Sequence, residues 1–502
     1  MKQLLFKTMI LLLPFVILAS GCSKADKPDL CKMKSGKVVA DPDTGPLLDR
    51  GPVAAIGPLK VLSSNSRYFT YDGTRAVYLT GSHTPHSFQD VRTGDTQKEF
   101  DYDVYLDFLR CHNHNFVRLW TWEDSSSEPF RYRRLGPGMA LDGELKFDLT
   151  RIDEAYLKRL RSRIKAAGAR EVYVAVMLFQ GRDNDEPQSK RVAWDAHPFN
   201  IKNNVNSING DPNGDEQGAE MHTLIPAITE LQEAYIKRVI DTVNDLDNVL
   251  YEISNESPTG REGIPWQQHL IRFIRDYERK HKPKQHPILM TWPWPSSENH
   301  HPLHSSPADA IYPDWAGDGN GIAEEHRANP PSSEGHRVIM ADTGRGGKGV
   351  GDRAWVWKSF MRGLNPIFMD PYDDSGAEDI HAMALNRVRV AMGHTRTYAK
   401  EMNLAGMVPR SDLASTGYCL ANIETGKPEL LVYAPQSEQG EMITVDLSTV
   451  SGMMTVEWFN PEKGEVVAAK PIAGGAKQTF TAPFHGDAVL HLAGIQAALP
   501  QP

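Results

Sequence analysis

Two acidic side chains in this sequence each follow an apolar run and could carry acid–base chemistry. Glu256 closes "VLYEISNE", and Asp342 lies at the end of "VIMAD". Runs rich in Val, Ile and Tyr predict buried strands, and polar residues directly after them stand at the strand ends. Hydrolysis of a glycosidic bond needs two carboxyl groups across the scissile bond, one protonated and one ionised. Strand ends in a deep pocket can separate the two pKa values in this way.

The segment "ISNES" resembles the Asn-Glu signature at the end of strand four in a large clan of barrel glycosidases. The resemblance makes Glu256 the general acid/base and Asn255 a donor to the sugar hydroxyl next to the reacting carbon. A solvated loop pair is the alternative. Glu252 lies four residues earlier, so we expect it to lie deeper in the strand and to be structural.

Asp342 departs from that clan, which has Glu at the end of strand seven. Aspartate is one methylene shorter, so three interpretations stay open. Asp342 is the nucleophile of a retaining reaction, or the reaction inverts through a water held between more distant carboxylates. In the third interpretation Asp342 only binds substrate, and Asp370 in "FMDPYDD" takes its role.

Arg118 in "NFVRLWTW" is expected to support the nucleophile, because a strand-two arginine with this role is a feature of the clan that the sequence resembles. It shares strand parity with Trp120 and Trp122, so the three side chains point to one side of the strand. A guanidinium there would keep a nearby carboxylate ionised. A structural salt bridge is the alternative.

Aromatic and histidine side chains at other strand ends are further candidates for substrate binding. Trp122, Trp292 and Trp294 can stack on sugar faces or pack in the core, and His83 and His86 can contact a sugar hydroxyl or the carboxylates. The His-x-x-His spacing has no apparent third ligand, so no metal is predicted there.

Eight short apolar segments interleaved with helical patterns must position these residues. This alternation predicts a parallel (β/α)8 barrel, an α/β TIM barrel whose functional face lies at the strand C-terminal ends. The expected strands are 76–81, 115–123, 171–181, 249–255, 287–292, 309–315, 336–344 and 365–371.

From residue 407 the apolar period changes to two, with strands separated by Gly, Pro and Ser, which predicts a small all-β antiparallel sandwich. The expected boundaries are 1–21 for a lipoprotein signal peptide, 22–57 for a tether, 58–406 for the barrel and 407–495 for the sandwich. The basic start and the apolar stretch predict a secretory signal, and "LASGC" resembles a bacterial lipobox, which implies lipidation of Cys22. An ordinary cleaved signal is the alternative. By analogy with such lipoproteins, Ser23 favours the outer membrane of a bacterial envelope. The lipid anchor is the only membrane contact expected, and a net charge of -9 argues against nucleic acid.

The segment Asn209–Glu220, "NGDPNGDEQGAE", nearly matches a calcium-loop spacing. Asn209, Asp211, Asn213 and Glu220 would be the ligands, with Gly214 at the sharp turn. No cofactor is expected to be required for catalysis. Structural calcium and a solvated lid loop are the two interpretations of this segment.

Longer motifs carry a family resemblance. "YLTGSHTPHSFQD", "NFVRLWTWE", "LYEISNES" and "GDRAWVWKSFMRGLNPIFMDPYDD" resemble the apiosidase-like barrels of bacterial polysaccharide-degrading proteins. "STGYCLAN", "VEWFNPEKGE" and "FTAPFHGDAVLHL" resemble the C-terminal sandwich named in such proteins as a collagen-binding domain. Two departures are Pro85, where an aromatic residue is expected, and "DTGRGG", where relatives often have Asp-Thr-Asp-His.

The resemblance implies a glycoside hydrolase with a carbohydrate substrate, with Glu256 and Asp342 as its carboxylate pair. Its mechanism is expected to be retaining. The alternative is a non-catalytic glycan-binding surface lipoprotein that uses the barrel as a scaffold, and a third hypothesis is an adhesin whose sandwich binds collagen.

Overall fold

The structure is a computed structural model. It describes residues 57–85, 87–93, 96–97, 99–123, 127–181, 194–257, 262–292, 301–313, 326, 328–343, 352–370, 372, 380–423, 426–437 and 440–495. The expected signal peptide, Cys22, almost all of the tether, His86 and Trp294 lie outside these residues. Among the helices in the described ranges, none combines the length and apolar content needed to cross a membrane.

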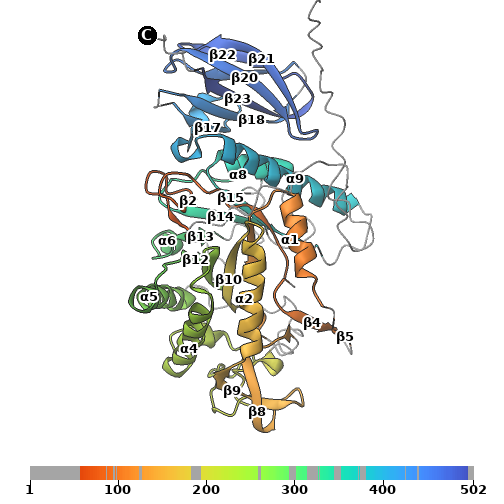
Figure 1. The fold of residues 1–502 in the computed structure, drawn as a ribbon, viewed down its shortest axis with the longest axis vertical. Coiled ribbons are helices and arrows are strands. Elements are labelled where there is room, and N and C mark those ends of the chain that lie inside the picture. Colours follow the sequence, from red (N-terminus) through yellow and green to blue (C-terminus); the bar gives the residue numbers. More distant parts are fainter. Residues whose placement is uncertain are drawn as a thin grey trace, which may run out of the picture. The chain divides into compact units, whose positions relative to one another are not determined.

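Eight parallel strands form a nearly closed barrel, as predicted (Figure 1). In spatial order they are β3 (Gly81–His83), β15 (Asn365–Met369), β14 (Val338–Thr343), β13 (Ala310–Tyr312), β12 (Ile288–Thr291), β11 (Val249–Asn255), β10 (Tyr173–Gln180) and β6 (Phe116–Leu119). The two edges meet just before β3 and β6, where the Asn115 N–H donates to the Thr80 carbonyl at 3.0 Å.

The first barrel strand begins later than predicted, at Gly81 instead of Ala76. Side chains satisfy the backbone just before it, because the Leu79 N–H donates to Asn365 Oδ1 at 3.1 Å and the Thr80 N–H donates to Asn115 Oδ1 at 3.0 Å. Side-chain oxygens thus take the place of the backbone carbonyls of a neighbouring strand. Residues 76–80 therefore have the apolar pattern of a strand without forming a strand of the barrel. His83 is consequently the last residue of β3 instead of a loop residue.

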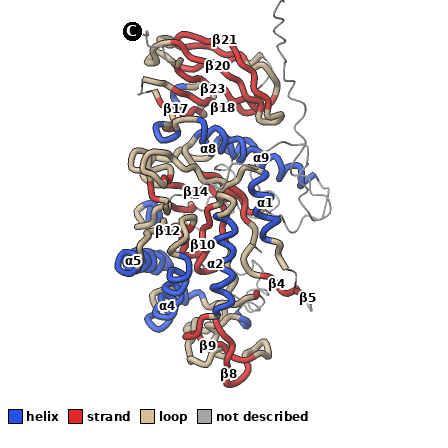
Figure 2. Tube along the Cα trace, viewed as in Figure 1, coloured by secondary structure: helices blue, strands red, loops and turns tan. Residues whose placement is uncertain are grey.

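Helices cover the outside of the barrel, and Figure 2 shows them beside the strands. Most lie between consecutive barrel strands, as the predicted alternation of strands and helices requires. They are α1 (Tyr102–Cys111), α2 (Glu154–Gly168), α4 (Pro226–Val243), α5 (Gly263–His281), α6 (His301–His304), α8 (Arg353–Met361) and α9 (Ile380–Glu401), with short 3-10 turns η1 (Ala219–His222), η4 (Leu404–Gly406) and η5 (Ser411–Leu413).

Several short strands lie outside the barrel. β1 (Lys60–Val61) pairs with β2 (Phe69–Thr70), and β4 (Asp90–Thr93) pairs with β5 (Thr96–Gln97) and β7 (Ser127–Glu128). The hairpin of β8 (Tyr132–Met139) and β9 (Leu145–Ile152) was not predicted. It lies where α2 begins, which is the end of the barrel at which the strands finish (Figure 1).

The strands from Val408 onward pair antiparallel, as predicted. One sheet has the order β16 (Val408–Pro409), β17 (Cys419–Asn422), β18 (Glu429–Ser437), β23 (Gly486–Gly494), β20 (Met453–Asn460) and β21 (Glu465–Ala473), and β19 (Met442–Asp446) pairs with β22 (Lys477–Thr481). The edge strand β21 was missed because it is exposed along nearly all of its length and shows no apolar alternation.

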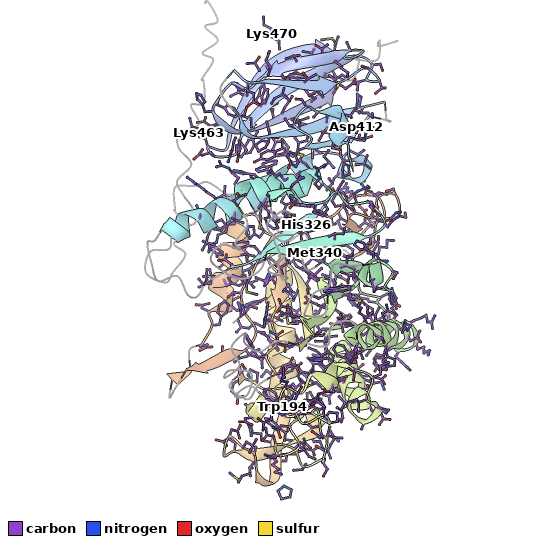
Figure 3. The ribbon with its side chains drawn as sticks, turned by 180° about the vertical axis from the view of Figure 1, so that it is seen from behind. Trp194, His326, Met340, Asp412, Lys463 and Lys470 are labelled. Atoms are coloured by element: carbon purple, nitrogen blue, oxygen red, sulfur yellow. The ribbon has the colours of Figure 1, made fainter. Side chains whose placement is uncertain are left out.

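The barrel interior has an apolar floor and a polar layer above it. Alternate residues of the strands point inward, and the buried apolar ones form one cluster that includes Phe116, Leu250, Ala310 and Met340. Met340, labelled in Figure 3, lies on β14 two residues before Asp342. Arg118, Glu252 and Asp342 each stand two residues after one of these inward-facing apolar residues. Their side chains therefore also point into the barrel, nearer to the C-terminal ends of the strands.

Candidate active site

Arg118 is the centre of the polar layer. Its Nε donates to Glu252 Oε2 at 3.0 Å, and its Nη2 donates to Glu252 Oε1. Nη1 donates to Asp342 Oδ2 at 2.9 Å, and Nη2 also donates to Asn255 Oδ1 at 2.9 Å. One guanidinium thus connects strand two to strands four and seven.

The charges around Arg118 determine its ionisation. Burial alone would lower the pKa of the guanidinium, but the carboxylates of Glu252 and Asp342 raise it above its ordinary value. Arg118 therefore stays charged. Glu252 is completely buried, and its carboxylate forms an ion pair with Arg118. This contact agrees with the expected structural role.

Asp342 is more accessible than its neighbours. Its side chain is 20% exposed, whereas those of Arg118 and Glu252 are 3% and 0% exposed. His83 Nε2 lies 3.1 Å from Asp342 Oδ2 and 3.2 Å from Oδ1. The His83 tautomer with its proton on Nε2 donates to this carboxylate. Asp342 thus receives hydrogen bonds from two sides and keeps an open side for a ligand.

Aromatic rings enclose this charge cluster. The His83 ring stacks on Trp120 with centroids 5.7 Å apart, and the Arg118 guanidinium carbon lies 5.1 Å from the Trp120 ring and 4.9 Å from the Tyr312 ring. Burial, together with the charge of Glu252, raises the pKa of Tyr312 well above its ordinary value, so the phenol is neutral. Sequence analysis missed Tyr312, although its parity with the inward-facing Ala310 could have indicated it.

Asn255 and Glu256 stand at the end of β11, in the predicted place. Asn255 Nδ2 donates to Gln180 Oε1 at 2.9 Å, at the end of the neighbouring β10. Glu256 is half-buried and has a φ of 41°, a left-handed conformation that is uncommon outside glycine. Such backbone strain is concentrated at functional sites.

Gly181 allows this turn of the chain. A Cβ on Gly181 would lie 2.3 Å from the Glu256 carbonyl oxygen and 2.3 Å from Ser257 Cα, both backbone atoms. The Gly181 N–H also donates to the Asn255 carbonyl at 2.7 Å. The ends of β10 and β11 therefore approach so closely that only glycine fits between them.

Two of the predicted site residues, Asp370 and Trp292, have buried side chains that are not open to a substrate. Asp370 is fully buried, and Arg389 of α9 donates to both of its oxygens, with Nε to Oδ2 at 2.8 Å. Its carboxylate is therefore occupied by an ion pair, which argues against substrate binding and against a catalytic role. Trp292 is 1% exposed and belongs to the main hydrophobic core, so its ring is not placed to stack on a sugar.

Trp122 is half-buried beside the cluster. Its indole N–H donates to the Pro85 carbonyl at 2.9 Å, and its ring lies 6.1 Å from that of Trp120. Pro85, one of the two departures from the family pattern, thus holds this tryptophan. The partly exposed ring remains a candidate for sugar stacking.

A second buried charge cluster lies at the ends of strands two and three. It was not predicted. Glu123 Oε1 accepts from Arg131 Nη2 at 2.9 Å and from the Gln180 N–H at 3.0 Å, and Oε2 lies 3.2 Å from His197 Nε2. Burial alone would raise the pKa of Glu123, but Arg131 and His197 lower it to about 2. Glu123 is therefore ionised and fixes the backbone of Gln180.

The calcium prediction falls on a loop where Asp211, Asp215 and Glu220 each offer an oxygen, all within 4.8 Å of one another. Asp215 belongs to this set in place of the predicted Asn213, whose amide donates to Glu220 Oε1 and, at 3.2 Å, to Asp215 Oδ2. Asn209 instead accepts from the Asp211 N–H at 3.1 Å. Glu220 Oε2 is enclosed without a partner among the described residues, so the set could accommodate a cation. Calcium binding here stays a prediction.

Comparisons with known proteins agree with this architecture. A solved structure described as "Glycoside hydrolase" superposes with a TM-score of 0.56 at 13% identity, covering 87% of this chain and 97% of that one. A glycoside hydrolase family 5 protein from Bacteroides vulgatus gives a TM-score of 0.52 at 14% identity, covering 87% and 94%. The chain has a glycoside hydrolase-like TIM-barrel fold.

This glycoside hydrolase-like barrel is followed by a domain of known sequence family. Residues 410–492 match the family described as "Putative collagen-binding domain of a collagenase". The chain matches none of the curated proteins with which it was compared. At these identities the structural likeness establishes the fold, and the chemistry has to be argued from the site.

Proposed function

We propose that the chain is a glycoside hydrolase in which Glu256 and Asp342 form the catalytic pair. The observation that carries this proposal is the placement of Asp342. It is an accessible carboxylate that accepts hydrogen bonds from Arg118 and His83, at the end of strand seven of a glycoside hydrolase-like barrel. Asn255, next to Glu256, is bonded to the same Arg118.

The proposed reaction is retaining. Glu256 donates its proton to the leaving oxygen as Asp342 attacks the anomeric carbon, which breaks the glycosidic bond and forms a glycosyl ester. Glu256 then removes a proton from water, the water attacks the same carbon, and Asp342 leaves as a carboxylate. Arg118 and His83 orient the Asp342 carboxylate for the attack and receive it again when the ester is hydrolysed.

The substrate is proposed from the family resemblance to be a plant, algal or microbial polysaccharide, and apiose-containing glycans are the first class to test. We would screen the mature protein against polysaccharides and aryl glycosides, beside Glu256→Gln, Asp342→Asn and the exposed control Glu262→Gln. Loss of acid/base or nucleophile should reduce sugar release by about a hundredfold or more, and the control should match the wild type.

Two other outcomes of the screen would change the role assigned to Asp342 or to the whole barrel. Release that survives Asp342→Asn would contradict its role as the nucleophile. Binding of a glycan without release across the panel would favour the non-catalytic scaffold, which the Asp in place of Glu on strand seven also motivates. Proton NMR of the first anomer released distinguishes retention from inversion.

We propose a structural role for the C-terminal domain, although the family that it matches is named for collagen. Its Tyr433, Phe459 and Val489 belong to the same hydrophobic core as the barrel helices. A pull-down with collagen should therefore recover none of the full chain.

Lipidation of Cys22 and anchoring to the outer membrane are proposed from the sequence pattern alone. Labelled palmitate should be incorporated into the wild type and not into Cys22→Ala, and that variant should move from the membrane fraction to the soluble fraction.

A further inference from the structure

A cavity of about 470 Å³ lies at the end of the barrel opposite the candidate active site. Its wall includes Asn115, Tyr173 and Asn248, which stand at the start of β6, β10 and β11. Gln180 and Asn255 stand at the other ends of β10 and β11. At roughly 3.3 Å per residue, the two ends of β10 are about 20 Å apart. The cavity is therefore separate from the carboxylate site.

The cavity has the size and the lining of a small-molecule site. Pockets for small ligands are typically about 300–1,000 Å³, mostly apolar, with a few polar groups that orient the ligand. Here the apolar part of the wall is aromatic and aliphatic and comes from the segment before β3, from β10 and from the end of α9. It includes Tyr71, Val77, Tyr78, Tyr173, Met402 and Leu404.

Arg396 of α9 is the unusual member of this wall. It is only 8% exposed, and all three hydrogen bonds that it donates come from Nη1, to the Asn113 carbonyl and Oδ1 at 3.1 Å and to the His114 carbonyl at 3.3 Å. Its Nε is enclosed and has no partner among the described residues. Among the described residues Nη2 has no acceptor and the guanidinium forms no ion pair, although Glu171 lies close enough for its charge to oppose the effect of burial on the pKa of Arg396.

A buried guanidinium without a carboxylate is energetically unfavourable, and arginine is seldom buried unless it is paired. Nη1 satisfies backbone carbonyls after α1 and Nε is enclosed, which leaves Nη2 as the group that can donate a charge-assisted hydrogen bond to a carboxylate or a phosphate in the cavity. Arg75 and Lys400 also line the cavity, against the single acidic side chain of Glu171.

We propose that this cavity is a second binding site, for a small organic anion that presents a carboxylate or a phosphate to Arg396 and a compact body to the tyrosines. The site is independent of the glycosidase proposal, because none of its residues belongs to the carboxylate site. Burial lowers the pKa of Arg396 to about 10, so the guanidinium is charged at neutral pH and available to an anion.

Isothermal titration calorimetry on the full chain at low salt tests the proposal, with glucuronate and inorganic phosphate as probes. Glucose serves as the neutral control because it has the same ring as glucuronate without the carboxylate. Glucuronate or phosphate should bind with a dissociation constant of about 1 mM or lower, the range of weak small-ligand sites, and glucose should give no heat. Which probe binds more tightly identifies the anionic group that the site prefers.

Two variants locate the binding. Arg396→Gln removes the guanidinium, and Thr74→Trp places an indole at the exposed mouth of the cavity, so each should weaken binding at least tenfold. If Arg396→Gln does not fold, Thr74→Trp decides alone. Asp342→Asn should bind as the wild type does. Binding of neither probe at about 10 mM, unchanged binding in a folded variant of the cavity, or loss of binding in Asp342→Asn would each overturn the proposal.

Discussion

Arg118 has five N–H groups and no acceptor, and this determines how the amide of Asn255 is turned. The oxygen of Asn255 must face Arg118, so its nitrogen faces Gln180 Oε1. One hydrogen of that nitrogen is left for a substrate hydroxyl. The Glu123 carboxylate in turn accepts from the Gln180 N–H. A continuous series of hydrogen bonds therefore runs from Glu123 to Asp342.

Gln180 is expected to position Asn255 through this series. Gln180→Met keeps the side-chain length and removes the acceptor, which leaves a buried N–H without a partner at a cost of about 1–3 kcal/mol. We expect kcat/KM on the substrate found by the screen to fall about tenfold, with a fall in melting temperature of only a few degrees, because the unfolding entropy of a chain of this length is large. Gln180→Glu restores an acceptor and should recover part of the loss. Equal kcat/KM for Gln180→Met and the wild type would contradict a positioning role.

His222 should make the stability of the protein depend on pH. It is fully buried, neither ring nitrogen has a partner among the described residues, and burial lowers its pKa to about 4. A histidine with a lowered pKa favours the unfolded state when it is protonated. Its stabilisation is therefore complete above about pH 6.5, the pKa of an unfolded histidine. It is lost as the pH falls from there towards 4.

The expected loss from this residue is on the order of 3 kcal/mol between pH 6.5 and pH 4. Urea denaturation at a series of pH values measures it. His222→Leu should show a shallower fall in the free energy of unfolding over this range, because leucine does not titrate. The exposed His336→Gln should retain the wild-type slope. Parallel curves for His222→Leu and the wild type would show that other groups cause the acid sensitivity.

At the scale of the elements, the alternation of short apolar runs with helical patterns was enough to predict eight parallel strands and their order, although the first was placed before β3. The period of two within each strand places Glu252 and Tyr312 inside the barrel, although only their contacts show that they surround Arg118. The ion pair of Asp370 could not be predicted, because Arg389 comes from a helix that returns to strand eight. The burial of Trp292 also depends on how neighbouring elements cover it. The hairpin of β8 and β9 was missed although Leu145, Phe147 and Leu149 alternate with polar residues in β9, because β8, which contains Gly136 and Pro137, shows no such pattern.

The Gly181→Ala variant tests whether the close approach of β10 and β11 determines the position of Glu256. In Gly181→Ala the new methyl group meets backbone atoms at 2.3 Å, so the chain at Glu256 must move. A displacement of about 1 Å at a catalytic group can cost about a hundredfold in rate, and we expect kcat to fall by this order. Gly426→Ala is the matched control, because Gly426 is exposed and a Cβ there meets nothing within 4 Å. Full activity in Gly181→Ala would show that the position of Glu256 does not depend on this contact.

At the scale of the molecule, the barrel and the antiparallel domain belong to one compact unit, Pro46–Pro502. Trp357 of α8 stacks on Tyr433 of β18 with centroids 6.0 Å apart and an interplanar angle of 15°. Arg353 Nε donates to Asp487 Oδ2 at 2.6 Å across the same boundary. The sequence predicted both folds from their different periods, but a change of period says nothing about which faces are joined. A shared apolar core of this kind predicts that the two parts unfold together.

Trp357→Ala should both destabilise the molecule and separate its two parts. Trp357 is fully buried and also packs on Phe459, with centroids 5.9 Å apart, so truncation leaves a cavity at the boundary and should cost about 3–5 kcal/mol. Because the lost contacts are those that join the barrel to the antiparallel domain, calorimetry should resolve two transitions in the variant and one in the wild type. Trp357→Phe retains a ring and should keep the single transition at a smaller cost. A single transition in Trp357→Ala would mean that the remaining contacts, including Arg353 with Asp487, are sufficient to couple the two parts.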